Sequence, residues 1–192
     1  MIVTFQEIID IAIMTVAVGF IFSDVFARFV RPRDPIAALQ RTRIADEGFK
    51  FAVIVTAPAI ILHELAHKFV AMAFGLSSVF RAAYSWLAIG VMLKLIGAPF
   101  IFFVPAYVQI IGHAGPLESA MIAFAGPAVN LMLWLGSSYA IRNRLVKKKH
   151  YSAIFLTSRI NMFLFFFNMI PIGFFDGAKV LSGVATYLKS IF

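Results

Sequence analysis

The sequence predicts an all-α membrane protein, a multi-pass helical bundle of about four to six transmembrane helices with a re-entrant or hairpin element. Apolar residue types make up 61% of the 192 residues and charged types only 14%, whereas a soluble domain is roughly half apolar and about a quarter charged. Four stretches are apolar over the ~20 residues that cross a bilayer. They are residues 2–22, 51–75, 119–141 and 153–175. This composition excludes a soluble globular enzyme, a disordered tail and a nucleic-acid-binding domain.

The basic residues lie mainly in two loops between these stretches, residues 28–50 and 142–149. Because positively charged loops stay in the cytoplasm, the net charge of +8 indicates membrane orientation, with both loops on the cytoplasmic side. The apolar region 82–112 between them must then cross the membrane twice or not at all.

Region 82–112 is interrupted by Lys94, Gly97, Pro99 and Pro105, and each half is too short for an ordinary crossing. A re-entrant hairpin, strands packed on protein, and two tilted short helices are all compatible with this pattern. If the region does not cross the membrane, a re-entrant hairpin is the favoured structure.

Residues 63–67 read His-Glu-Leu-Ala-His inside the second apolar stretch. Residues four apart share a helical face, so His63 and His67 can bind one metal ion, and Glu64 beside them can hold or deprotonate a metal-bound water. An ionisable residue in a membrane helix costs about 2.5–3.5 kcal/mol on insertion scales, and a metal would compensate three of them. The alternative is a polar cluster that lines a water-filled cavity or a proton path.

A catalytic zinc needs a third protein ligand, and the chain has no cysteine. Asp176 is the strongest candidate, since it follows a helix break predicted at Pro171 and Gly173. The helices that carry His67 and Asn168 each rise about 24–26 Å from a basic loop on the same side, so the histidine and the break reach similar depth. The alternative role of Asp176 is to cap a short helix over residues 177–192.

Other polar residues fit structural roles better. Glu118 begins the stretch 119–141, where the helix dipole favours an acid, and we interpret it as a cap. His113 lies in a turn-like Gly-rich segment and fits an interfacial residue or a substrate contact. Gly126 fits helix packing, and Asn130 can hydrogen-bond across to the helix of the two histidines.

Three motifs together make the chain resemble the site-2 proteases, a family of intramembrane zinc metalloproteases. They are His-Glu-Leu-Ala-His at 63–67, Phe-Ala-Gly-Pro-Ala-Val-Asn at 124–130, and Asn-x-x-Pro-x-x-x-x-Asp-Gly at 168–177. The resemblance implies a zinc ion as cofactor, Glu64 as the general base, and site support or substrate binding by two asparagines. The zinc ligands that it implies are His63, His67 and Asp176. The two asparagines are Asn168 and, in a smaller role, Asn130.

The resemblance implies a zinc metalloendopeptidase that cleaves peptide bonds of transmembrane substrates within or near the bilayer, as in regulated intramembrane proteolysis. The expected partners are a membrane-spanning protein or peptide substrate and the lipid bilayer, and no nucleic acid. Two alternatives stay open: a membrane zinc protease of the prenyl-peptide-processing type, with Glu as third ligand, and a non-enzymatic metal or proton transporter.

We expect a single membrane domain over residues 1–192, in a multi-pass integral protein of the cell membrane. Its catalytic core covers about residues 50–177, and the first span 2–22 and a C-terminal helix 178–192 are accessory. The basic loops place the site in the outer half of the membrane, whereas the family resemblance implies the cytoplasmic half, so the orientation stays open.

Overall fold

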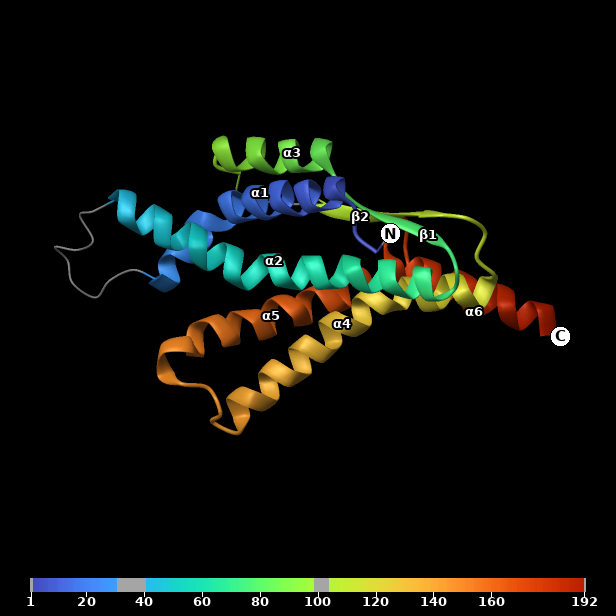
Figure 1. Ribbon diagram of the computed structural model, residues 1–192. Coiled ribbons are helices and arrows are strands. Elements are labelled where there is room, and N and C mark those ends of the chain that lie inside the picture. The colour runs from blue at the N-terminus through green and yellow to red at the C-terminus, as the bar shows by residue number, and fades with distance from the viewer. Residues whose placement is uncertain (1, 31–40, 99–103, 192) are drawn as a thin grey trace. The chain divides into compact units, whose positions relative to one another are not determined.

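The computed structural model describes residues 2–30, 41–98 and 104–191 (Figure 1). The chain divides into two compact units, one of Met1–Ile60 with Arg81–Tyr107 and one of Ile61–Phe80 with Val108–Phe192. The described residues form six α-helices, one short 3-10 helix and two short strands. This confirms the predicted all-α membrane fold.

Among the described residues, three helices are long and apolar enough to cross a membrane. They are α1 (Phe5–Val30), the Asp46–Ala73 part of α2 (Arg41–Ala73), and α4 (Pro116–Arg142). They coincide with three of the predicted spans. The fourth prediction, residues 153–175, falls on α5 (Tyr151–Asn168), which ends earlier and is not among the three. The protein is therefore a membrane protein, and the total number of crossings stays a prediction.

The described part of the interrupted region contains one helix and one strand, and a second strand ends at its first residue. Strands β1 (Ser77–Ala82) and β2 (Ala106–Ile111) pair in a two-stranded sheet, and α3 (Tyr84–Leu95) lies between them in sequence. Helix α3 has 12 residues, or about 18 Å at 1.5 Å each, which is shorter than the bilayer core. Gly97 after it has a φ of 69°, which favours glycine. Pro99 lies outside the described residues, and a re-entrant path stays a prediction.

In the first unit, polar side chains of α1 form hydrogen bonds with residues of α3. The Tyr84 hydroxyl of α3 donates a hydrogen bond to fully buried Asp10. Near the other end of α1, the Lys94 ammonium donates to the Ser23 hydroxyl and to the Phe20 carbonyl. These contacts hold α3 along α1, as Figure 1 shows. The buried Asp10 Oδ1 atom and the Ser23 hydroxyl of this apolar helix thus each have a hydrogen-bond partner in α3.

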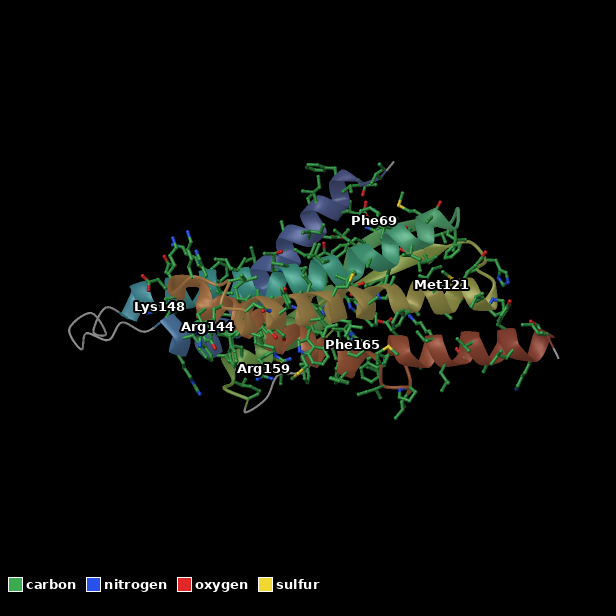
Figure 2. All side chains as sticks on the ribbon, turned by 90° about the horizontal axis from the view of Figure 1, so that it is seen from below. Phe69, Met121, Arg144, Lys148, Arg159 and Phe165 are labelled. Atoms are coloured by element: carbon green, nitrogen blue, oxygen red, sulfur yellow. The ribbon has the colours of Figure 1, made fainter. Side chains whose placement is uncertain are left out.

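In the second unit, α4 packs against α5 and against α6 (Asp176–Ile191). Helix α6 falls on the C-terminal helix predicted over residues 178–192. The Ser138 and Ser158 hydroxyls hydrogen-bond at 2.8 Å between α4 and α5. The turn between these helices is the exposed, basic loop predicted at 142–149, where Figure 2 labels Arg144 and Lys148. The single domain expected over residues 1–192 stays a prediction.

Helix α6 lies so close to α4 at Gly183 that a larger residue has no room. A Cβ there would lie 2.5 Å from the Pro116 carbonyl oxygen and 3.0 Å from the Ala120 Cβ. We expect Gly183→Ala to lower the free energy of unfolding by about 1–3 kcal/mol, because overpacking shifts the helices apart. Denaturant unfolding in detergent measures this. Ser182→Ala, at the exposed neighbouring position, is the control, and equal stability of the two variants would contradict the expectation.

Candidate metal centre

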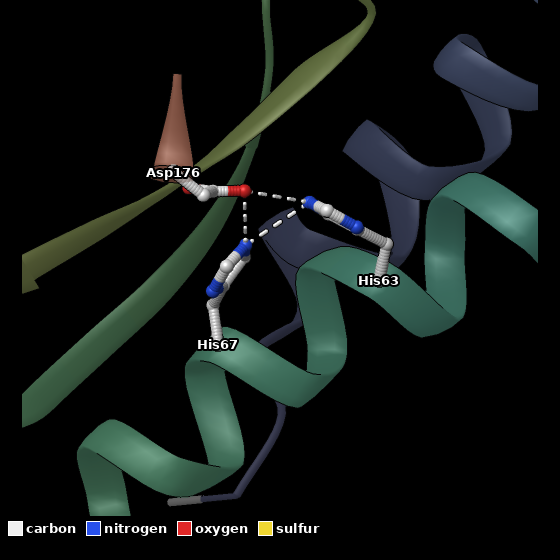
Figure 3. A group of neighbouring side chains, drawn as sticks. All are labelled: His63, His67 and Asp176. Carbon is white, nitrogen blue, oxygen red and sulfur yellow. Dashed lines mark hydrogen bonds and ion pairs between the residues drawn. The ribbon is translucent and has the colours of Figure 1, made fainter. Parts of the chain in front are cut away.

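His63 and His67 lie one helical turn apart on α2, and both imidazoles face the Asp176 carboxylate (Figure 3). The Asp176 Oδ2 atom lies 3.2 Å from His63 Nε2 and 3.3 Å from His67 Nε2. The two Nε2 atoms are 3.0 Å apart. All three residues belong to the second unit. The structure therefore brings together the predicted ligand set.

Local sequence explains how each ligand reaches this point. The uninterrupted helix α2 places the two histidines on one face by their four-residue spacing. Helix α5 ends at Asn168, and Gly173 in the following turn has a φ of 62°. Asp176 is then the first residue of α6, with Gly177 tight against the Met169 backbone. The predicted helix break is present, and it returns the carboxylate to α2.

The cluster is buried and strongly polar. His63 and His67 are 6% and 7% exposed, and the Asp176 side chain is 13% exposed. Burial by itself raises the pKa of the Asp176 carboxyl, but the imidazoles of His63 and His67 outweigh it and hold that pKa below its usual range. The carboxylate is therefore ionised at neutral pH and is available as a metal ligand.

The outer nitrogens of both imidazoles face oxygen atoms. His67 Nδ1 lies 2.7 Å from the Ile122 carbonyl oxygen, and His63 Nδ1 lies 2.6 Å from Asn130 Oδ1. A carbonyl oxygen only accepts hydrogen bonds, so each Nδ1 donates and each neutral imidazole keeps its Nε2 lone pair toward Asp176. Metal-binding histidines almost always donate their other N–H in this way.

Two nitrogen lone pairs and one carboxylate oxygen thus converge in a buried space. Such an arrangement is repulsive unless protons or a metal ion lie between the atoms. The three donor atoms lie within 4.8 Å of one another. Two imidazoles and a carboxylate are typical zinc ligands, and three protein ligands leave a position open for catalysis. The residues present therefore fit a catalytic zinc ion.

Gly126 of α4 lies directly against both imidazoles. A Cβ at this position would lie 2.7 Å from His63 Nε2 and closer still to His67 Nε2. The sequence pattern indicates helix packing at Gly126, and the structure shows that this packing occurs against the Nε2 atoms that face Asp176. A side chain at position 126 would displace the two imidazoles.

The other candidate site residues of the sequence analysis lie on α2, at the end of α5, and at or just before the start of α4. Glu64 is half-buried and follows His63 on α2. Asn168 is the last residue of α5. The Glu118 carboxylate accepts a 2.8 Å hydrogen bond from the Gly115 N–H at the start of α4, which confirms the cap interpretation. His113 is exposed, and neither it nor Glu118 belongs to the cluster found among the described residues.

Sequence reasoning missed Asn161 and the Ile122 carbonyl. Asn161 is fully buried in α5 and accepts a 2.8 Å hydrogen bond from Asn130 Nδ2. An asparagine inside an apolar stretch is a signal in itself, because a polar side chain in a membrane helix needs a partner. A backbone carbonyl leaves no comparable signal in a sequence.

A protein of Methanocaldococcus jannaschii named "Putative zinc metalloprotease" is 36% identical to this chain over 182 residues, which cover 92% of this chain and 83% of that protein. This chain belongs to the same zinc metalloprotease family. The cofactor of this zinc metalloprotease is a zinc ion, as the buried histidine and aspartate cluster also indicates. No family model matches the chain, and no solved structure matches it.

The role of Gly126 in the zinc metalloprotease is testable by one added methyl group. We expect Gly126→Ala to lose most of its bound zinc, because the new Cβ would displace the Nε2 atoms of His63 and His67. Metal analysis of the purified protein measures zinc content, and circular dichroism checks the helices. Gly136→Ala on the same helix is the matched control, since a Cβ there meets nothing within 4 Å. Wild-type zinc content in Gly126→Ala would contradict the placement of the ion.

Proposed function

We propose that this zinc metalloprotease cleaves transmembrane substrates within or near the bilayer, as expected of the site-2 proteases that its motifs resemble. One observation carries the proposal: two members of the buried cluster, His63 and His67, lie inside a helix that is long and apolar enough to cross a membrane. A protease with its site at that position acts on chains that enter the membrane. Its substrates are therefore membrane-spanning proteins or peptides.

The chemistry follows from the residues around the cluster. His63, His67 and Asp176 would hold the zinc ion, which when bound polarises a peptide carbonyl and lowers the pKa of water. Glu64 accepts a proton from the attacking water and delivers it to the leaving amine nitrogen. A C–O bond forms at the scissile carbonyl and the C–N bond breaks. Asn168 and Asn130 support the site or hold the substrate chain.

The substrate helix must open before it is cut. Its carbonyl groups are tied into the helical hydrogen-bond ladder, and an unpaired backbone group is costly in lipid. Glycine and proline, which disfavour helix, would lower that cost near the scissile bond. We therefore infer a preference for transmembrane segments with helix-breaking residues. We also propose a multi-pass location in the cell membrane, with the lipid bilayer as a partner and without nucleic acid.

The nearest alternative is a membrane protease of the prenyl-peptide-processing type, which takes a glutamate as third ligand. We expect Asp176→Ala to lose zinc and Glu118→Ala to retain it, because the Asp176 carboxylate faces both imidazoles whereas the Glu118 carboxylate caps α4. Zinc content of the two purified variants, alongside the wild type, measures this. The reverse result would support the prenyl-peptide-processing type.

The proposed base is testable without disturbing the ligands. In proteoliposomes with a reporter that has one transmembrane helix, we expect Glu64→Gln to slow cleavage by about 10²–10⁴-fold, because the amide cannot accept the proton. Zinc content should be unchanged. Asp46→Asn, at an exposed position of the same helix, is the control.

Two outcomes would contradict the proposal in different ways. Full cleavage by Glu64→Gln with zinc retained would refute Glu64 as the base. Cleavage of a soluble peptide of the same sequence, with no cleavage of the membrane-embedded reporter by the wild type, would refute an intramembrane protease.

A further inference from the structure

A row of hydrogen bonds connects the candidate metal centre to the backbone of α5. Asn161 Nδ2 donates to the Thr157 carbonyl oxygen at 2.8 Å, and Asn161 Oδ1 accepts from Asn130 Nδ2 at 2.8 Å. Asn130 Oδ1 lies 2.6 Å from His63 Nδ1. Both asparagines are fully buried. The row therefore passes from α5 through α4 to α2 entirely within the second unit.

The direction of every bond in this row follows from its far end. The Thr157 carbonyl only accepts, so Asn161 must turn its NH₂ group toward it and its oxygen toward Asn130. Asn130 must then turn its NH₂ group toward Asn161 and its oxygen toward His63. His63 consequently carries its proton on Nδ1, and the Nε2 lone pair is left facing Asp176.

The opposite orientation of the Asn130 amide would change which nitrogen of His63 carries the proton. An amide has nearly the same shape when its oxygen and nitrogen are exchanged, so shape alone does not fix it. With the NH₂ group toward His63, Nδ1 would have to accept and the proton would move to Nε2, the atom that faces Asp176. An imidazole protonated there has no lone pair for a metal ion.

The two histidines differ in this respect. His67 Nδ1 is paired with the Ile122 backbone carbonyl, which cannot exchange donor and acceptor. His63 is paired with the side-chain amide of Asn130, which can exchange its donor and acceptor by turning over. The tautomer of His63 therefore depends on what holds Asn130. We propose that Asn161 is a positioning residue for the metal centre, which fixes the orientation of Asn130 and thereby keeps His63 in the tautomer that binds zinc. This inference rests on the proposed role of His63 as a zinc ligand.

The test uses four purified variants and two measurements, and a fifth variant, His63→Ala, checks the ligand assignment. Asn161→Ala removes the group that orients Asn130. Ser158→Ala is the matched control, because it removes the buried 2.8 Å hydrogen bond to Ser138 between the same two helices without touching the row. Asn130→Asp presents only acceptor oxygens to His63, whatever Asn161 does. The double variant combines Asn130→Asp with Asn161→Ala.

Zinc affinity by competition with a chelator is the first measurement. We expect Asn161→Ala to weaken zinc binding by about 10–100-fold, the usual effect of a lost outer partner of a metal ligand. Ser158→Ala should bind zinc as the wild type does. In the Asn130→Asp background, Asn161→Ala should not weaken zinc binding further, because a carboxylate needs no orienting partner and no longer faces the acceptor oxygen of Asn161.

Nitrogen NMR of the metal-free protein, with labelled histidine and at a pH where the imidazoles are neutral, is the second measurement. The wild type and Ser158→Ala should show His63 protonated on Nδ1, and Asn161→Ala should show a mixture of tautomers. Wild-type affinity with the Nδ1 proton retained in Asn161→Ala would overturn the proposal. Equal losses in Ser158→Ala, or equal losses from Asn161→Ala in both backgrounds, would also overturn it, because they indicate general helix packing.

The failure of the metal-ligand assignment gives a different result. If His63→Ala binds zinc as tightly as the wild type, His63 is not a ligand and the proposed site is wrong. The tautomer measured in the metal-free Asn161→Ala protein then still decides whether Asn161 orients Asn130.

Discussion

The convergence of two imidazole lone pairs and one carboxylate in a buried space is the constraint on which the second unit depends. Water screens these groups little, so protons or a metal ion must offset their repulsion. Each feature of the surrounding helices serves this convergence. The four-residue spacing on α2 supplies the nitrogens, the turn after Asn168 returns Asp176 to them, and Gly126 leaves the space between helices α2 and α4 free.

Local patterns predicted much of the candidate site. The spacing of His63 and His67 fixes a shared helical face wherever the helix lies, and Pro171 and Gly173 break α5 for reasons of backbone geometry. The acidic start of α4 likewise identified Glu118 as a cap. In contrast, the pairing of His67 with the Ile122 carbonyl joins positions 55 residues apart. Such a contact depends on how two helices cross, which no short stretch of sequence records.

The fold was predictable in class and less so in detail. Counting apolar residues found α1, α2 and α4, because their polar residues are few. The same counting extended α5 to residue 175, past the end of the helix at Asn168. The buried polar residues of α5, Ser158 and Asn161, face partners on α4. The described part of region 82–112 combines helix α3 with strand β2, because its short segments satisfy several patterns equally and tertiary contacts decide among them.

The pairing of α2 with α4 shows why the metal site tolerates so little change in register. On α4, Ile122, Gly126 and Asn130 are spaced by four and share one face, as His63 and His67 do on α2. The partners follow opposite orders along the two helices: His63 pairs with Asn130, and His67 pairs with Ile122.

Gly126 lies midway between the two partners on α4, where its backbone lies against the Nε2 atoms of His63 and His67. A slip of one residue would turn a helix by about 100° and advance it by about 1.5 Å, which would break both outer hydrogen bonds at once. The histidine tautomers in this protein therefore depend on the same helix register as the packing. The packing that places the imidazoles also fixes which of their nitrogens faces the ion.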